Sequence, residues 1–216
     1  MAELSTKLLT VTIESYFKQP PLYQEAKCDE MARKALEAFA SYGLKASDIF
    51  VKAGAAFNYE VSFNLFNGNG RFRISAEKAE VHFQGATGPK DFDLVLDCIT
   101  KFYQHVPLPE MSTSAISANA HSVAITVEAA QEYLSRYADP AKGIVRGGTI
   151  AIIVVDKWKE EIKLSVEQSL ILPAGLFITW NTSMSGGKFS REVLNTMTDA
   201  CNDAAAKLDL TFIHAQ

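Results

Sequence analysis

Residues 57–83, FNYEVSFNLFNGNGRFRISAEKAEVHF, decide the fold class of this chain. Apolar and polar residues alternate on both sides of Asn67–Gly70, whose residue types tolerate positive φ and are typical of a hairpin turn. The alternation slips by one residue across Glu77-Lys78. We expect a second tight turn there, because a slip inside one strand would turn every later side chain to the other face. Strands joined by such short connections pair antiparallel, so the stretch predicts a three-stranded antiparallel meander.

Helical patterns flank this meander. Apolar residues at helical spacing predict one helix within residues 22–42 and a second over residues 91–106. Gly43 is the expected end of the first helix, because glycine adopts the left-handed cap without strain. Residues 7–17 alternate before the first helix and predict a half-buried strand. The order of elements in residues 1–108 is therefore β-α-β-β-β-α.

The same order of elements recurs in residues 109–216. We expect a strand over residues 114–126, a helix capped by Thr126, three strands and a last helix capped by Ser190; the three strands are expected at residues 149–156, 161–172 and 176–182. The residue identities do not repeat, so an internal duplication rests on element order alone. The predicted fold is α+β, with halves 1–108 and 109–216 in one compact unit and helices packed on one face of the antiparallel sheet or sheets.

Composition and charge limit the function classes. The chain has 216 residues, 48% hydrophobic and 21% charged, with a formal net charge of −4; this is typical of a globular protein and disfavours a nucleic-acid binder. No apolar run approaches the roughly 18–20 residues that a membrane helix needs, and no signal-peptide pattern opens the sequence. The three widely spaced cysteines are expected to be buried, reduced thiols. We therefore expect a cytoplasmic protein that does not act at a membrane.

Motifs that would identify a chemistry are missing from the sequence. It has no phosphate-binding glycine loop, no zinc-ligand spacing and no nucleophile elbow. We therefore predict no catalytic residue, no metal site and no cofactor.

One group of polar residues is a candidate ligand site. Glu80 and His82 share one face of a predicted strand, and Asn119 and His121 share one face of another. If those two strands were neighbours, the four side chains would converge in a cleft between the halves. The alternative is that they form the solvated side of a half-buried sheet.

The second half contains more apolar residues than one helix layer can cover. Residues 149–155, TIAIIVV, are apolar on both sides of the predicted strand, and residues 170–172 and 176–178 break the alternation in the same way. A sheet with helices on one face should be polar on the other. Three explanations are open: the chain's own residues cover the excess, a partner or second copy covers it, or an apolar ligand pocket lies between the halves.

The expected function follows from this excess. We expect a non-catalytic interaction or assembly module that binds a protein partner or a second copy through Ile153, Val155, Ile171 and Phe177. The alternative is a small-molecule-binding protein or enzyme with a cleft between the two halves.

Overall fold

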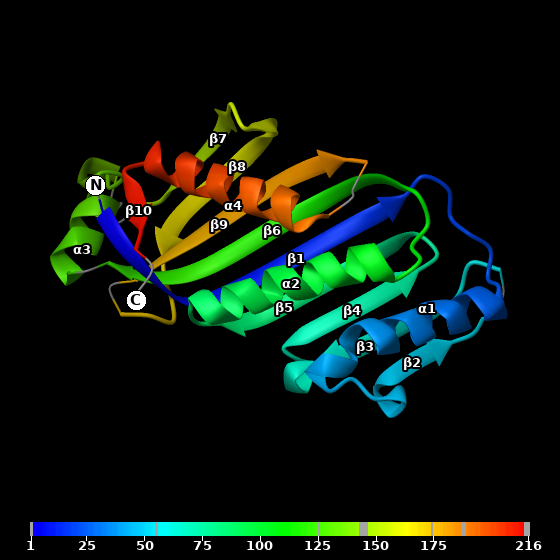
Figure 1. Cartoon of the computed structure of the whole chain (residues 1–216). Helices are drawn as coiled ribbons and strands as arrows, with labels where there is room; N and C mark the ends of the chain where they lie inside the picture. Colours follow the sequence, from blue (N-terminus) through cyan, green and yellow to red (C-terminus); the bar gives the residue numbers. More distant parts are fainter. Residues whose placement is uncertain are drawn as a thin grey trace.

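The structure is a computed structural model, and it describes residues 2–54, 56–124, 126–142, 147–173, 175–186 and 189–213. Within these residues ten strands form one sheet, and four α-helices pack on it (Figure 1). The α+β fold with an antiparallel sheet and helices on one face is confirmed. Whether the two halves arose by duplication remains a prediction.

The first half supplies five strands and two helices, which are β1 (Ala2–Phe17), α1 (Glu25–Phe39), β2 (Ile49–Lys52), β3 (Glu60–Leu65), β4 (Gly70–Ser75), β5 (Lys78–Ala86) and α2 (Pro89–His105). The second half supplies the rest, which are β6 (Met111–Ala124), α3 (Val127–Ser135), β7 (Thr149–Val155), β8 (Trp158–Gln168), β9 (Gly175–Ser185), α4 (Arg191–Ala206) and β10 (Leu210–Phe212).

The two long strands β1 and β6 pair antiparallel at the middle of the sheet. From this centre each half adds its strands in reverse chain order, β5-β4-β3-β2 on one side and β9-β8-β7 on the other. The neighbouring strands on this path are antiparallel, whereas β10 pairs parallel with the first residues of β1. The outermost strands are therefore β2 and β7.

The expected turns and helix ends are found where the sequence places them. The chain turns between β3 and β4 through Asn67 and Gly68, both at positive φ, and again between Ser75 and Lys78. Gly43 has a φ of +82° after α1 and a short 3-10 turn. Thr126 Oγ1 accepts a hydrogen bond from the Ala129 amide at 3.1 Å, which caps α3, and Ser190 Oγ accepts one from the Val193 amide at 3.2 Å, which caps α4.

One strand is absent from the sequence prediction. Residues Ile49–Lys52 form β2, which pairs with β3 and gives the first half a fourth meander strand. Three consecutive apolar residues in a four-residue strand show no alternation, so only the pairing with β3 reveals it. The first strand is also longer than expected, since β1 begins at Ala2.

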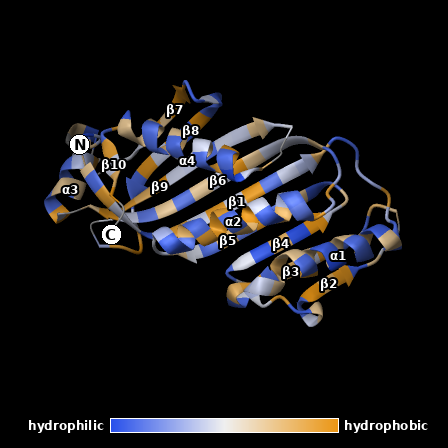
Figure 2. Cartoon of the chain, in the orientation of Figure 1, coloured by the Kyte–Doolittle hydropathy of each residue, from blue (hydrophilic) through white to orange (hydrophobic). Residues whose placement is uncertain are grey.

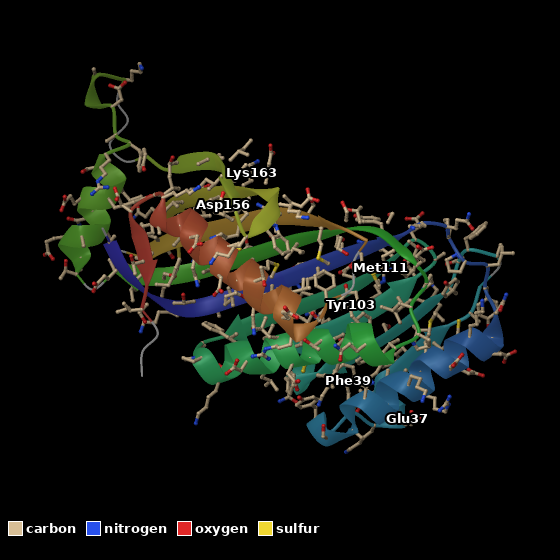
Figure 3. The ribbon with its side chains drawn as sticks, turned by 45° about the horizontal axis from the view of Figure 1, so that its top comes forward. Glu37, Phe39, Tyr103, Met111, Asp156 and Lys163 are labelled. Carbon is tan, nitrogen blue, oxygen red and sulfur yellow. The ribbon has the colours of Figure 1, made fainter. Side chains whose placement is uncertain are left out.

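Aromatic packing attaches the helices to one face of the sheet. Phe63 and Phe72 stack on neighbouring strands with ring centroids 4.7 Å apart, Phe39 of α1 lies 5.1 Å from Phe72, and Phe102 of α2 lies 5.2 Å from it. All four rings are buried. Such pairs contribute about 0.5–1.5 kcal/mol each beyond the area they bury, so this cluster fixes α1 and α2 on the sheet. Figure 3 labels Phe39 on α1.

A β-bulge interrupts β1 near its start. Thr6 and Leu8 pair with the consecutive β6 residues Ser122 and His121, so Lys7 is an extra residue without a partner on that strand. An extra residue shifts the alternation of side chains by one position, so that residues of the other parity face the helices beyond it. The bulge places Lys7 on the rim of a cavity that lies on the helix-covered face.

Candidate functional site

The four polar residues expected to share a cleft do not converge. Glu80 and His82 lie on β5, Asn119 and His121 lie on β6, and β1 runs between these strands. All four face away from the helices, but β5 and β6 are about 10 Å apart, because each strand spacing is about 4.8 Å. The sequence could not show this arrangement, because it depends on pairing between β1 and strands far along the chain.

Neighbouring side chains contact three of these half-buried polar residues, Glu80, His82 and His121. His82 Nδ1 lies 2.9 Å from Thr12 Oγ1, and Glu80 pairs with Lys78 at 3.1 Å. His121 Nδ1 lies 2.9 Å from Ser169 Oγ. These contacts belong to a polar sheet surface, which is the alternative that the sequence left open.

The expected partner surface is corrected at two of its four residues. Ile153 and Val155 are only 7% and 5% exposed, because they lie opposite Ile162 and Trp158 in the core on the α4 side of β7. The exposed residues of β7 have the opposite parity. Since TIAIIVV is apolar at both parities, the sequence predicts an excess of apolar side chains but not which set is outward.

The exposed apolar row of β7 consists of Ile150, Ile152 and Val154. These residues are 64%, 66% and 58% exposed, and their side chains lie on the face of the sheet without helices. Ile171 is also exposed, in the β8–β9 loop, whereas Phe177 is half-buried with its ring centroid 4.6 Å from that of His121. The first of the three explanations, cover by the chain's own described residues, therefore does not hold for this row.

The position of β7 makes this row a candidate binding site. β7 is an outermost strand, so no described strand pairs with its outer side. Lys207 Nζ donates to the Val154 carbonyl at 2.6 Å, which satisfies one main-chain group near the end of the strand. The opposite outer strand, β2, is shorter and ends in Lys52. Figure 2 shows hydrophobic colouring on both outer strands.

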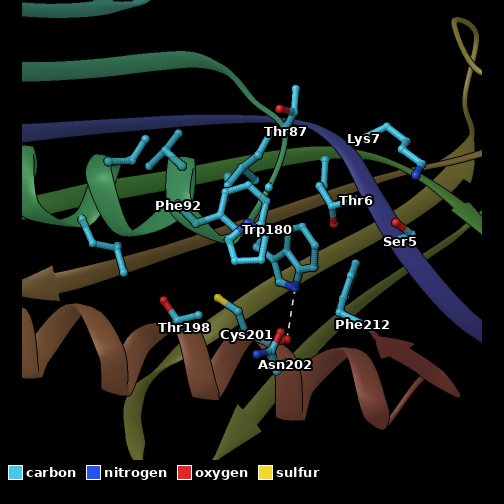
Figure 4. A pocket seen from close by; sticks show the side chains of 18 of the residues that line it. Ser5, Thr6, Lys7, Thr87, Phe92, Trp180, Thr198, Cys201, Asn202 and Phe212 are labelled. Atoms are coloured by element: carbon cyan, nitrogen blue, oxygen red, sulfur yellow. Dashed lines mark hydrogen bonds between the residues drawn. The ribbon is translucent and has the colours of Figure 1, made fainter. Parts of the chain in front are cut away.

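A second candidate site is a cavity of about 230 Å³ between α2 and α4, on the helix-covered face. It lies between the two halves, because β1 and α2 of the first half and β6, β9, α4 and β10 of the second half form its walls. Figure 4 shows Trp180 at its centre, with Phe92 and Phe212 beside it and Lys7 toward the rim. The residues that line it differ from the polar group expected from the sequence.

The interior of this cavity offers little chemistry. Trp180 Nε1 already donates to the Cys201 carbonyl at 3.1 Å. Burial raises the pKa of the Cys201 thiol to about 12, so the sulfur carries its proton at neutral pH and is a poor nucleophile. The three cysteines are free thiols, as the sequence predicts, although Cys201 is only half-buried as a residue.

Neither a metal-binding cluster nor a membrane-spanning helix is found in the part of the chain that the structure describes. Among the described residues no three His, Cys, Asp or Glu side chains gather in a way that could hold a metal ion. In the same part of the chain, no helix combines the length and the apolar character needed to span a membrane.

Comparison with known proteins does not assign this chain to a family. No protein-family model matches this chain, and no match was found among curated proteins. The features that bear on function are therefore β7 and the cavity.

Proposed function

We propose that the chain is an assembly module that pairs the outer edge of β7 with the same edge of a second copy. The observation that supports this proposal is the row of Ile150, Ile152 and Val154, exposed on an outermost strand. Large apolar side chains on an unpaired edge are what a β-strand partner buries.

The backbone of β7 specifies the kind of partner. An outermost strand presents unpaired N–H and C=O groups along one side, and an added strand satisfies them in register. β7 runs for seven residues, and among the described residues the bond from Lys207 occupies the carbonyl of Val154. The residues before Val154 therefore remain available for a main-chain ladder.

The side-chain pattern favours a second copy as the partner. Antiparallel pairing about a two-fold axis near Ile152 places Ile152 opposite the same residue of the second copy and Ile150 opposite its Val154. Each exposed apolar side chain then meets another one on the same face of a continuous sheet. The spacing is thus self-complementary.

The free energy available indicates a reversible dimer. Pairing at the edge leaves the sheet face open to solvent and adds lateral contacts between opposite side chains, which contribute about 0.2–1 kcal/mol for each pair. The three pairs of this register therefore supply roughly 0.6–3 kcal/mol. Association itself costs about 4–15 kcal/mol, and ladder hydrogen bonds return about 0.5–1.5 kcal/mol each. We expect dimerisation that depends on protein concentration.

Sedimentation velocity of matched variants tests the proposal. Ile152→Lys should shift the protein to monomer at concentrations where the wild type is dimeric, because two ammonium groups would meet near the axis. Phe50→Lys makes the same change at an exposed residue of β2, the other outer strand, and should leave the dimer intact. A wild type that stays monomeric up to about 100 μM, well above a micromolar Kd, or a dimer lost in Phe50→Lys but kept in Ile152→Lys, would overturn it.

That Ile171 and Phe177 contribute to a partner surface remains a prediction. Neither residue lies on β7, and the dimer proposed here does not require them. Replacing Ile171 by Lys in the same sedimentation experiment would show whether the exposed β8–β9 loop adds to the interface.

A further inference from the structure

We propose that the cavity between α2 and α4 binds a small amphipathic carboxylate, with its apolar part against Trp180 and its carboxylate beside Lys7 (Figure 4). This proposal is independent of the β7 interface, which lies on a different part of the sheet.

The walls of the cavity require an apolar ligand body. Leu9 and Val11 of β1, Phe92 of α2, Trp180 of β9 and Phe212 of β10 all line it. The one indole N–H among them is already bonded to a main-chain carbonyl. A polar group placed between these side chains would lose its hydrogen bonds to water without replacement, so the interior selects against polar molecules.

The size of the cavity limits the ligand. A cavity of about 150 Å³ holds benzene, with six carbon atoms, which is about 25 Å³ for each non-hydrogen atom. On that scale the 230 Å³ cavity holds roughly nine such atoms. A saturated chain of about eight carbons or a single substituted aromatic ring fits this space, whereas a long-chain fatty acid does not fit without an opening of the helices.

The charge at the rim specifies the head group. Lys7 is the one charged residue among the described residues that line the cavity. It is exposed, it lines the cavity at the bulge of β1, and in the described part of the chain no carboxylate forms an ion pair with it. An ammonium at the mouth of an apolar cavity attracts a carboxylate whose tail lies inside.

Asp91, one residue before the lining residue Phe92, forms no ion pair with Lys7 among the described residues. The Asp91 carboxylate accepts hydrogen bonds from the amide and hydroxyl of Thr87, at 3.0 and 2.9 Å, and these bonds lower the pKa of Asp91. Asp91 is thus held at the first turn of α2. Ser5 and Asn202 also line the rim, and their side chains can donate to a carboxylate as well.

Titration calorimetry with octanoate and 1-octanol tests the proposal. The two probes have the same tail, so the wild type should bind octanoate more tightly at pH 7. Lys7→Met keeps the apolar stem but removes the charge, and should weaken octanoate binding by roughly three- to tenfold while leaving 1-octanol binding unchanged. Lys163→Met, on the sheet face without helices, is the matched control and should behave as the wild type.

A second variant separates the cavity from binding elsewhere. Ala118→Leu adds three carbon atoms at a half-buried position of the cavity wall, and should weaken both probes. Its thermal unfolding shows whether the protein remains folded, and if it does not, Thr198→Leu at the α4 wall replaces it. Failure of the wild type to bind either probe would overturn the proposal. Equal octanoate affinity in wild type and Lys7→Met would overturn the assignment of a carboxylate ligand.

Discussion

Two adjacent valines show how strongly environment depends on strand parity. Val155 lies in the core opposite Trp158, whereas Val154 projects from the exposed face of β7. No difference between the two residues in the sequence indicates this. A substitution that is harmless at one position should therefore be severe at the other.

We predict that Val155→Glu lowers the free energy of unfolding by about 3–5 kcal/mol, because an unpaired carboxylate would lie in the core. Val154→Glu should change it by less than about 1 kcal/mol. Urea denaturation at low protein concentration, where assembly does not contribute, measures both. Equal effects of the two substitutions would show that the two faces of β7 are assigned wrongly.

An ion pair on the sheet face without helices gives a pH prediction. A hydrogen bond from Lys78 holds the pKa of the Glu14 carboxyl below its ordinary value of 4.5. A lowered pKa in the folded protein contributes stability above pH 4.5, and this contribution is lost as the pH falls through the folded-state pKa.

Lys78→Met should reduce this dependence, so its stability should fall less than that of the wild type as the pH is lowered from 6 to 3. Thermal unfolding at several pH values measures the slope. Lys78→Met also removes the contact between Lys78 and Glu80. Glu14→Gln leaves that contact in place, so it is the matched variant, and it should reduce the dependence of stability on pH in the same way. An unchanged slope in both variants would contradict the assignment.

At the scale of elements, the sequence is informative where the signal is local. Caps at Thr126 and Ser190, the glycine after α1 and the turn at Asn67–Gly70 all depend on a few neighbouring residues, and these predictions are confirmed. Features that depend on pairing between strands far apart along the chain are not visible in the sequence. The strand β2, the bulge at Lys7 and the insertion of β1 between β5 and β6 belong to this second group.

The cap of α4 allows a quantitative test at this scale. Ser190→Ala removes the acceptor of the Val193 amide and should lower the free energy of unfolding by about 1 kcal/mol. Asn195→Ala, at an exposed position inside the same helix, should be neutral or slightly stabilising. A neutral Ser190→Ala would mean that water satisfies this helix end equally well.

At the scale of the whole molecule, the pairing of β1 with β6 joins the strands of residues 1–108 and 109–216 in one sheet. Because each half adds strands outward from this pair, the sheet ends in β2 and β7, and the apolar excess predicted from the sequence lies at one of these ends. The cavity lies near the middle, where α2 and α4 flank the junction of the halves. Both candidate sites thus follow from the same arrangement, one at its edge and one at its centre.

The β7 edge is the basis of the proposed assembly, and hydrogen–deuterium exchange at two protein concentrations measures it most directly. Amides of β7 that pair with a second copy exchange more slowly when the dimer is populated. We expect protection of residues 149–155 to rise with protein concentration in the wild type and to stay constant in Ile152→Lys, while β2 amides change in neither protein. Exchange of β7 that is independent of concentration in the wild type, or concentration-dependent protection confined to β2, would contradict assembly through β7.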